Sequence, residues 1–329
     1  MDIKSVLLAL LVVLIWGVNF SVIKVGLETL PPIFFSGLRF FIVALPAVFF
    51  IPRPKVKLWQ LFAVGLSLGV IKFSLLFMAM QDDASAGIAS LFLQSQVIFT
   101  IVLSALILRE MVTWPQRIGL LVAFIGFGLF FFTSTGSATF TGVAMIVAAG
   151  FFWAIANLVM KQMPGVNLMH FMVWVSLIPP IPLFALSYWF ESHQPFALLQ
   201  ATPLSGWLSI AYVGYLSTLV AFAIWGWLLN QHTSASVTPF ALLIPIVGMG
   251  AASIGLGESL SMIEWLGAAL IVVGLSLSVL GRRIGRWLGL KSRNADDVCA
   301  VMFSLGHLIT WPPLIEQASS LKRLITDQQ

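Results

Sequence analysis

The stretch VLLALLVVLIWGVNFSVIK, residues Val6–Lys24, begins with an unbroken apolar run and meets its first polar side chain only at Asn19. About 20 mostly apolar residues are what an α-helix needs to cross the hydrocarbon layer of a membrane. The ending of the stretch, from Trp16 onward, returns in the second half of the chain as WAIANLVMK, residues Trp153–Lys161. The sequence therefore opens with a predicted membrane helix and repeats its ending further along the chain.

The composition extends this prediction to the rest of the chain. Of the 329 residues, 60% are hydrophobic and 9% are charged, whereas a soluble domain carries about 25% charged residues. The apolar blocks lack the alternation that β-barrel strands require, so the expected fold class is an all-α polytopic membrane protein. The net charge of +5 follows the loops rather than one surface, so no nucleic-acid partner is expected.

Ten transmembrane helices are expected between the polar breaks. Their predicted ranges are 5–24, 32–51, 58–80, 85–108, 114–133, 139–160, 169–190, 205–229, 234–256 and 262–281. With the N-terminus inside, Lys and Arg fall mainly in the inner loops and Asp and Glu mainly in the outer loops. Because cytoplasmic loops are enriched in Lys and Arg, both termini are predicted to be cytoplasmic.

The repeat, which has an offset of 137 at the opening stretch, extends further along the chain. Four residues recur at an offset of 148, namely Glu110, Gly119, Gly126 and Leu129 as Glu258, Gly267, Gly274 and Leu277. Each half is thus predicted to be a five-helix repeat, over residues 1–136 and 137–282, with a tail at 283–329. Because five is odd, the second repeat enters the membrane inverted. Inverted repeats are typical of secondary transporters, whose binding site lies near the midplane.

The residues carrying this pattern resemble those of a known family. WGVNFSVIKVGLETLPPIFFSGLRF, then AGIASLFLQSQ, Glu110 and GLLVAFIGFGLFF are similar to the drug/metabolite transporter superfamily, and most to its EamA family. The resemblance implies an exporter of small amino-acid metabolites in the bacterial inner membrane, with a central cavity and alternating access. It names cysteine or O-acetylserine as the cargo. The second half lacks an arginine equivalent to that in GLRF, and the chain continues well beyond the family's usual ending.

Two cations lie inside predicted spans. Lys72, in GLSLGVIKFSLLF, falls near the middle of the third span, where a cation costs about 2.5 to 3.5 kcal/mol on insertion scales. It is the first candidate for binding a substrate carboxylate, although a structural bond to carbonyls remains open. Arg39 offers a bidentate fork to a carboxylate, but the same fork can tie neighbouring helices together through carbonyls.

Polar and aromatic residues supply further candidates for substrate binding. Gln94 and Gln96 diverge by about 200° on a helix, so one is expected to line the path and the other to bond a neighbouring helix. Asn19 and Asn157 follow the repeated tryptophans. The remaining candidates for the lining are Trp16, Trp153 and Trp225, for which interfacial anchoring or packing is the alternative.

The repeated lysines, Lys24 and Lys161, end the first and sixth spans at opposite faces of the predicted membrane. Both can snorkel to headgroups, with Lys24 steadied by Glu28 one turn on. The alternative is a pair of equivalent gate residues, one for each side.

The predicted spans contain no acid or histidine near their middles. Before the tail, every Asp and Glu lies at or near the end of a predicted span, and no histidine lies at a predicted midplane. Because the interior charges are all basic, the expected cargo is a small molecule with a carboxylate, either anionic or zwitterionic. No catalytic motif, metal site or cofactor is expected, and the partners are this cargo and the lipid bilayer.

The function that follows is secondary export of small amino-acid-like metabolites. The runner-up is the same machinery with another cargo, such as an aromatic amino acid, a nucleobase or a drug. A membrane receptor, scaffold or enzyme is a remoter alternative. The tail is read as a basic juxtamembrane segment followed by an interfacial or loosely ordered run. Prolines in the seventh and ninth spans indicate that the second half contains the more deformable helices, and a fixed kink is equally compatible with them.

Overall fold

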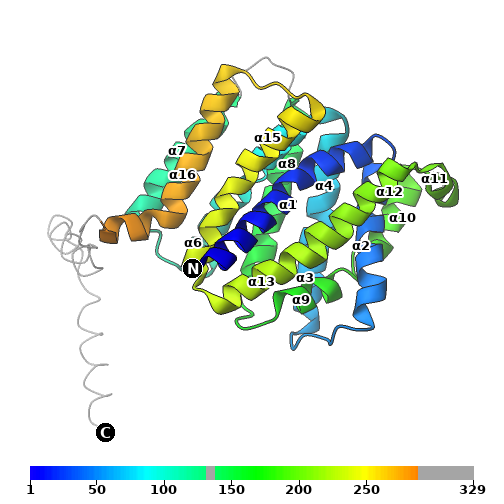
Figure 1. The fold of residues 1–329 in the computed structure, drawn as a ribbon, viewed down its shortest axis with the longest axis horizontal. Helices are drawn as coiled ribbons and strands as arrows, with labels where there is room; N and C mark the ends of the chain where they lie inside the picture. Colours follow the sequence, from blue (N-terminus) through cyan, green and yellow to red (C-terminus); the bar gives the residue numbers. More distant parts are fainter. Residues whose placement is uncertain (131–137, 288–329) are drawn as a thin grey trace, which may run out of the picture. The chain divides into compact units, whose positions relative to one another are not determined.

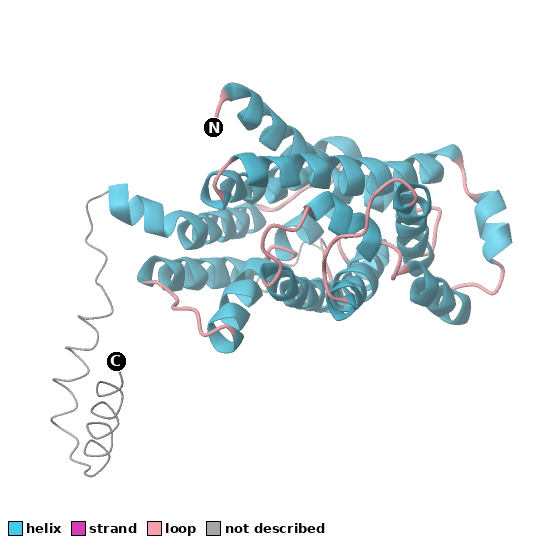
Figure 2. Cartoon of the chain, turned by 90° about the horizontal axis from the view of Figure 1, so that it is seen from below, coloured by secondary structure: helices cyan, strands magenta, loops and turns pink. Residues whose placement is uncertain are grey.

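The structure is a computed structural model that describes residues 1–130 and 138–287. Within these ranges the chain is helical and forms no strand, as Figure 2 shows. An isolated bridge pairs Ala84 with Ala138. The predicted all-α class is therefore confirmed for the described part of the chain.

The helices follow one another with short connections (Figure 1). In chain order they are α1 (Ile3–Leu27), α2 (Pro32–Val48), α3 (Leu58–Val64), the π-helix η1 (Gly65–Lys72), α4 (Phe73–Met78), the π-helix η2 (Ala79–Asp83), α5 (Ala86–Phe92), α6 (Ser95–Ile107), α7 (Trp114–Leu129), α8 (Phe140–Lys161), α9 (Leu168–Val175), α10 (Pro180–Phe190), α11 (Pro195–Ala201), α12 (Leu204–Ala211), the π-helix η4 (Tyr212–Val220), α13 (Ala221–Gln231), α14 (Ser234–Val237), the 3₁₀-helix η5 (Thr238–Leu243), α15 (Ile244–Leu256) and α16 (Met262–Trp287).

Eight helical stretches within the described ranges are long and apolar enough to cross a membrane, judged by length and composition. Two shorter apolar helices, α2 and α7, accompany them. Every predicted span overlaps one of these ten segments. The short helix α11, between α10 and α12, was not predicted. Most of the tail, from residue 288 onward, lies outside the described residues, so its predicted interfacial run is not described.

Several of the long stretches are irregular. The seventh expected span breaks between α9 and α10, before Pro180, and the ninth begins as α14 and η5 around Pro239. The third and fourth expected spans are also irregular, without any proline. Irregular helices therefore occur in both halves. A π-helix adds one residue to a turn and requires no particular side chain, so the sequence does not signal it.

Side-chain caps begin several helices. The Asp2 carboxylate accepts a hydrogen bond from the Ser5 N–H at the start of α1, and the Ser85 hydroxyl accepts one from the Ile88 N–H in α5. The Thr139 hydroxyl accepts one from the Gly142 N–H in α8. Such caps satisfy N–H groups that lack a partner in the first turn, and replacing one with alanine typically costs about 1 kcal/mol.

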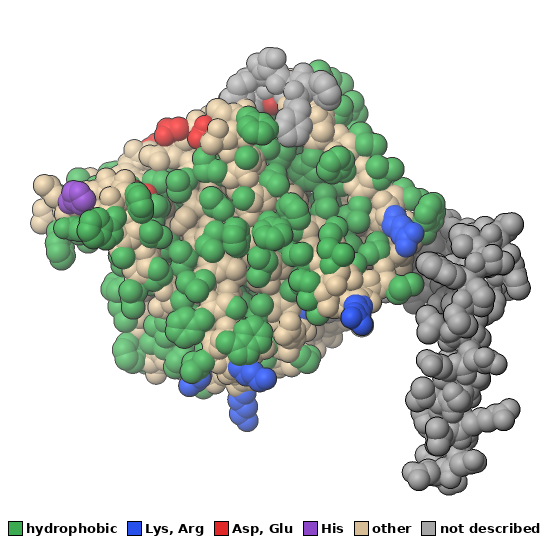
Figure 3. Space-filling view, turned by 180° about the vertical axis from the view of Figure 1, so that it is seen from behind, with side chains coloured by type: hydrophobic (Ala, Val, Ile, Leu, Met, Phe, Trp, Pro, Cys, Tyr) green, Lys and Arg blue, Asp and Glu red, His purple; other side chains and the backbone are tan. Residues whose placement is uncertain are grey.

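Two ends of the helical bundle can be told apart. Helix α8 is 22 residues long, or about 33 Å, so its first and last residues lie at opposite ends. We call the end at Phe140 the Glu258 end and the end at Lys161 the Lys161 end. Figure 3 shows Asp and Glu side chains gathered at one end of the visible face and Lys and Arg side chains toward the other.

Glycine pairs bring α7 and α16 together, and the two helices lie side by side in Figure 1. A Cβ built on Gly126 would lie 2.8 Å from the Gly267 carbonyl oxygen, and one on Gly119 would meet the Gly274 carbonyl oxygen still closer. Small residues let membrane helices approach until their backbones touch. This contact therefore requires glycine at all four positions.

We expect Gly126→Ala to destabilise the protein by about 1–3 kcal/mol, because the added methyl group overpacks the contact with α16. The matched control is Gly128→Ala in the same helix, since a Cβ there meets nothing within 4 Å. Thermal unfolding of the purified protein in detergent measures both. Equal melting temperatures for the two variants would contradict the close approach of α7 and α16.

Candidate functional site

Two buried cations share one aromatic ring. Lys72, the last residue of η1, is 3% exposed, and Arg39 of α2 is 4% exposed. The Lys72 Nζ lies 3.3 Å from the Phe73 ring centroid, and the Arg39 Cζ lies 3.7 Å from the same centroid. The two charged groups are therefore near neighbours. The Lys72 Nζ also lies 4.7 Å from the Trp153 ring. We call Arg39, Lys72, Phe73 and Trp153 the Lys72 cluster.

The Lys72 cluster contains no acid. Among the described residues, neither cation has an ion-pair partner or a side-chain hydrogen bond, and the Arg39 Nε is buried without any partner. A cation–π contact contributes up to about 2 kcal/mol when desolvated, whereas burying an ion costs several kcal/mol. The rings therefore offset only part of the cost of the two charges. Arg39 thus differs from the carbonyl-bonded role that the sequence left open for it.

A hydrogen-bonded group adjoins the Lys72 cluster. The Asn157 Nδ2 donates to the Gln96 Oε1 at 2.8 Å and to the Thr100 Oγ1 at 3.1 Å, which joins α8 to α6. Asn157 follows Trp153 by one helical turn, so both side chains lie on the same face of α8. Gln96 thus makes the bond between helices that was expected of one of the two glutamines. Gln94 is also buried, at the break before α6.

A second aromatic group lies on α1 and α13. The Trp16 ring packs at 5.2 Å from Phe222 and 5.3 Å from Trp225, and its Nε1 donates to the Ser217 carbonyl. Asn19 lies one turn further along α1, and its Oδ1 is buried without a partner among the described residues. The repeated asparagines therefore differ, since Asn157 is hydrogen bonded and the Asn19 Oδ1 is not.

One core cluster contacts both groups. It consists of Leu61, Val64, Leu68, Ala156, Val159, Phe171, Met172 and Val175. Phe73 and Trp153 of the Lys72 cluster pack against it, and so does Phe222, the neighbour of Trp16. The predicted substrate-binding residues are thus brought together in two groups around one apolar layer.

Charged side chains contact helix ends at the Glu258 end. Glu258 accepts from the N–H groups of Ala86 and Gly87 at 2.7 and 2.9 Å, at the start of α5. Glu191 accepts in the same way from Ile33 and Phe34 at 2.6 and 2.9 Å, at the start of α2. A carboxylate is stabilised there because these N–H groups lack partners within the helix and carry partial positive charge.

Lys24 makes the converse contact at the same end. Its Nζ donates to the carbonyl oxygens of Met80 and Gln81 at 2.6 and 3.0 Å, near the end of η2. The expectation that Glu28 steadies Lys24 is wrong, because Lys24 instead reaches carbonyls of another span. Helix C-termini attract cations because their last carbonyls lack intrahelical partners. The interaction therefore links α1 to the end of the third expected span.

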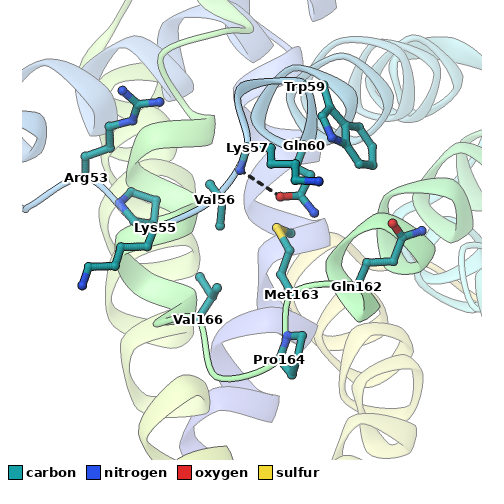
Figure 4. Close-up of a pocket in the computed structure, with 11 residues that line it drawn as sticks. Arg53, Lys55, Val56, Lys57, Trp59, Gln60, Gln162, Met163, Pro164 and Val166 are labelled. Atoms are coloured by element: carbon teal, nitrogen blue, oxygen red, sulfur yellow. Dashed lines mark hydrogen bonds between the residues drawn. The ribbon is translucent and has the colours of Figure 1, made fainter.

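The Lys161 end is arranged differently. The Lys161 Nζ and the Glu110 Oε2 form an ion pair at 2.6 Å, with both side chains 47% exposed. Nearby, a hollow of about 800 Å³ is lined by residues 53–57, 59, 60, 162–164 and 166, including Lys57, Gln60 and Gln162. Figure 4 shows the side chains of Arg53 and Lys55 pointing away from Gln162, whereas Lys57 and Gln60 lie on the side facing it.

The sequence did not reveal the roles of Glu191 and Glu258 as caps of distant helices. Each lies more than 150 positions from its partners in the chain, so no local pattern signals the contact. Their position at the ends of expected spans was the available sign. These two acids, which the sequence placed at the ends of expected spans, thus stabilise helix ends.

Comparison with known proteins identifies the family. The EamA-like transporter family matches this chain over residues 3–132 and again over residues 140–280. This chain belongs to the EamA-like transporter family. The two matched segments cover nearly all of the residues that the structure describes, and the resemblance seen in the sequence is thereby confirmed.

Relatives of this EamA-like transporter have functional names. A protein of Salmonella typhimurium named "Probable amino-acid metabolite efflux pump" is 38% identical, over 86% of this chain and 97% of its own length. A protein of Escherichia coli K12 with the same name is 38% identical over 85% of this chain and 96% of its own. A solved structure described only as "Crystal structure of protein" shares the fold, with a TM-score of 0.58 at 17% identity, over 86% of this chain and 99% of that one.

We expect a measurable coupling between Asn157 and Gln96 of this EamA-like transporter. Hydrogen bonds between membrane helices contribute about 0.6 kcal/mol on average and up to about 1.7. A double-mutant cycle of Asn157→Leu and Gln96→Leu, followed by thermal unfolding in detergent, measures that coupling. The control cycle pairs Asn19→Leu with Gln96→Leu and should give none. Additive effects of Asn157→Leu and Gln96→Leu would rule out the bond.

Proposed function

We propose that this EamA-like transporter is a secondary exporter of small amino-acid-like metabolites, of the cysteine or O-acetylserine type, in the bacterial inner membrane. It works by alternating access. The family match and the two relatives named as efflux pumps support the class of function and its direction. The cargo is carried over from the resemblance and is the part that most needs an experiment.

The proposed architecture is ten transmembrane helices in two inverted five-helix repeats, residues 1–136 and 137–282, followed by the tail at 283–329. Helix starts support it. Helix α1 begins at Ile3 and α8 at Phe140, which is the offset of 137, while α7 begins at Trp114 and α16 at Met262, which is the offset of 148. These are the two offsets of the sequence repeat. The family also matches the chain twice.

The glycine contacts offer independent support for the repeat. Gly119 is equivalent to Gly267 and Gly126 to Gly274 at the offset of 148. Exchanging the two halves therefore converts the contact of Gly119 with Gly274 into that of Gly267 with Gly126. Both contacts occur between α7 and α16. A twofold axis that relates the repeats would produce this pair of contacts.

The Lys72 cluster is the proposed site for the cargo's carboxylate, and it is the observation that carries the proposed cargo class. Two cations that contact the same ring are buried without an acid. A carboxylate bound to both would offset the cost of burial that the rings leave uncompensated. The proposed lining further includes Asn19, Gln94, Gln96, Asn157, Trp16, Trp153 and Trp225.

The same cluster bears on the alternatives. A cationic drug would be repelled by Lys72 and Arg39, whereas an aromatic amino acid carries the carboxylate that the site favours. An aromatic amino acid is therefore the second candidate cargo. The segregation of charges in Figure 3, together with the loop charges of the sequence, supports the proposal that the Lys161 end and both termini are cytoplasmic.

We expect Lys72→Met to lower efflux about 10- to 100-fold, because a charge-assisted hydrogen bond to the cargo contributes about 1.5–3 kcal/mol. Lys72→Arg, which keeps the charge, should retain part of the activity. The control is Lys55→Met, which removes an exposed cation. Efflux of labelled cargo from loaded cells, with the amount of protein in the membrane measured alongside, distinguishes the variants. Unchanged efflux by Lys72→Met would remove Lys72 from the site.

Overexpression in bacteria should raise the amounts of cysteine and O-acetylserine in the medium, because an exporter moves its cargo down the gradient available to it. Metabolite profiling of the medium measures this directly, with cells expressing Lys72→Met as the control. A rise confined to aromatic amino acids would favour the second candidate. No change in either group would contradict the proposed cargo.

A further inference from the structure

Four charged residues occupy equivalent positions in the two repeats but make different contacts. Lys24 corresponds to Lys161 at the offset of 137, and Glu110 corresponds to Glu258 at the offset of 148. At the Glu258 end, Lys24 and Glu258 each bind the end of a helix. At the Lys161 end, Lys161 and Glu110 bind each other. Perfect twofold symmetry would not produce this difference.

The packing of the fourth and ninth expected spans shows the same asymmetry. Helices α5 and α15 pack tightly near the Glu258 end, where Ser90 of α5 meets Gly248 of α15. The opposite ends of the same two spans, α6 and α14, share no comparable contact among the described residues. Ser90 is 1% exposed, whereas Thr238, its equivalent at the offset of 148, is partly exposed. Among the described residues, the two spans thus pack closely at the Glu258 end and have no comparable packing at the Lys161 end.

The contacts of Glu258 have equivalents at the other end. Glu258 binds the N–H groups of Ala86 and Gly87, where α5 begins. The offset of 148 leads to Ser234 and Ala235, where α14 begins. Helices α14, η5 and α15 follow one another without a break from Ser234 to Leu256, so the start of α14 is also the start of a long helical stretch. The first backbone N–H groups of that stretch are therefore the same kind of partner for Glu110 that Glu258 uses at α5.

The contacts of Lys24 have equivalents as well. Lys24 binds the carbonyl oxygens of Met80 and Gln81. The same offset leads to Leu228 and Leu229, in the last turn of α13. A carbonyl oxygen accepts more than one hydrogen bond, so these atoms can receive the Lys161 ammonium even where they already bond within the helix.

We propose that these four residues exchange partners during the transport cycle. In the structure, Glu258 and Lys24 hold the Glu258 end closed, while Glu110 and Lys161 are paired at the open end. In the opposite conformation, Glu110 binds the start of α14 and Lys161 binds the carbonyls of Leu228 and Leu229. Glu258 and Lys24 are then released and pair with each other. This exchange rests on the proposed function, because it requires a transporter that alternates between two states.

The exchange explains how both conformations remain accessible. Each state contains one set of helix-end contacts and one exposed ion pair, so the two states differ little in electrostatic energy. Two states of similar free energy are what alternating access requires. The four residues act as positioning residues for the moving helices and need not touch the cargo.

Removing one carboxylate should shift the balance between the states in a predictable direction. A carboxylate that accepts from two backbone N–H groups is bound more strongly than an exposed ion pair. Glu258→Gln therefore weakens the state seen in the structure. Glu110→Gln weakens the opposite state, because the contact it loses there is stronger than its ion pair with Lys161.

The test uses two reporter cysteines in a Cys299→Ser background. Ser90→Cys reports opening of the Glu258 end, and Thr238→Cys reports opening of the Lys161 end. The rate of labelling by a membrane-impermeant maleimide is measured on the full chain in lipid nanodiscs, with no cargo added. Glu258→Gln should label Ser90→Cys roughly tenfold faster and Thr238→Cys more slowly. Adding Glu110→Gln to Glu258→Gln should return both rates toward those of the parent.

The controls separate exchange from simple loss of stability. Asp82→Asn removes an exposed acid at the same end and should leave both rates unchanged. Lys24→Gln and Lys161→Gln repeat the test if a glutamate variant fails to fold. Lys24→Gln should change the two labelling rates in the same direction as Glu258→Gln, and Lys161→Gln in the same direction as Glu110→Gln. Faster labelling of Ser90→Cys in the double variant than in Glu258→Gln would overturn the exchange, as would no effect of Glu258→Gln. Labelling needs no cargo, so a wrong cargo would leave this result standing.

Discussion

A peptide group without a hydrogen-bond partner is too costly to leave in hydrocarbon, and this constraint governs the structure. Within a helix the backbone groups hydrogen bond to one another, but the first N–H groups and the last carbonyls have no partner inside the helix. In this protein, charged side chains from distant helices supply several of the missing partners. Glu191, Glu258 and Lys24 each bind the end of a helix that is remote in sequence. The ends of the helices are therefore places where the bundle is held together.

The Lys72 cluster is the exception to this arrangement. Its two cations lie among aromatic rings with no acid beside them among the described residues. The acids with described contacts are engaged elsewhere, on helix ends, on Thr139 or in the pair with Lys161, and none of them pairs with Lys72 or Arg39. A site with uncompensated positive charge in a low-dielectric interior attracts anions strongly. The same separation of acids from interior cations thus stabilises helix ends and leaves the proposed carboxylate site without a described counter-ion.

The sequence correctly predicted the features that depend on local residue patterns. The apolar blocks located the helices, and the offsets of 137 and 148 recur in the starts of α1 and α8 and of α7 and α16. It was less successful with side-chain partners. Arg39 was weighed as a residue bonded to carbonyls, but it packs on Phe40 and Phe73 instead. Lys24 was assigned to Glu28, one turn away, yet it binds Met80 and Gln81. Neither choice is encoded nearby in the chain.

The sequence by itself determined the class, the helices and the repeated residue pattern of this EamA-like transporter, because hydrophobic length and residue spacing are properties of the chain alone. Tertiary structure decided at which end α5 and α15 pack closely, which cations share a ring and which helix ends the glutamates cap. These outcomes depend on how helices pack, and helix packing is determined by contacts between residues that lie far apart in the chain. The difference between the contacts of Glu258 and Glu110 appears only there, since the repeat places both residues in the same connection of their half.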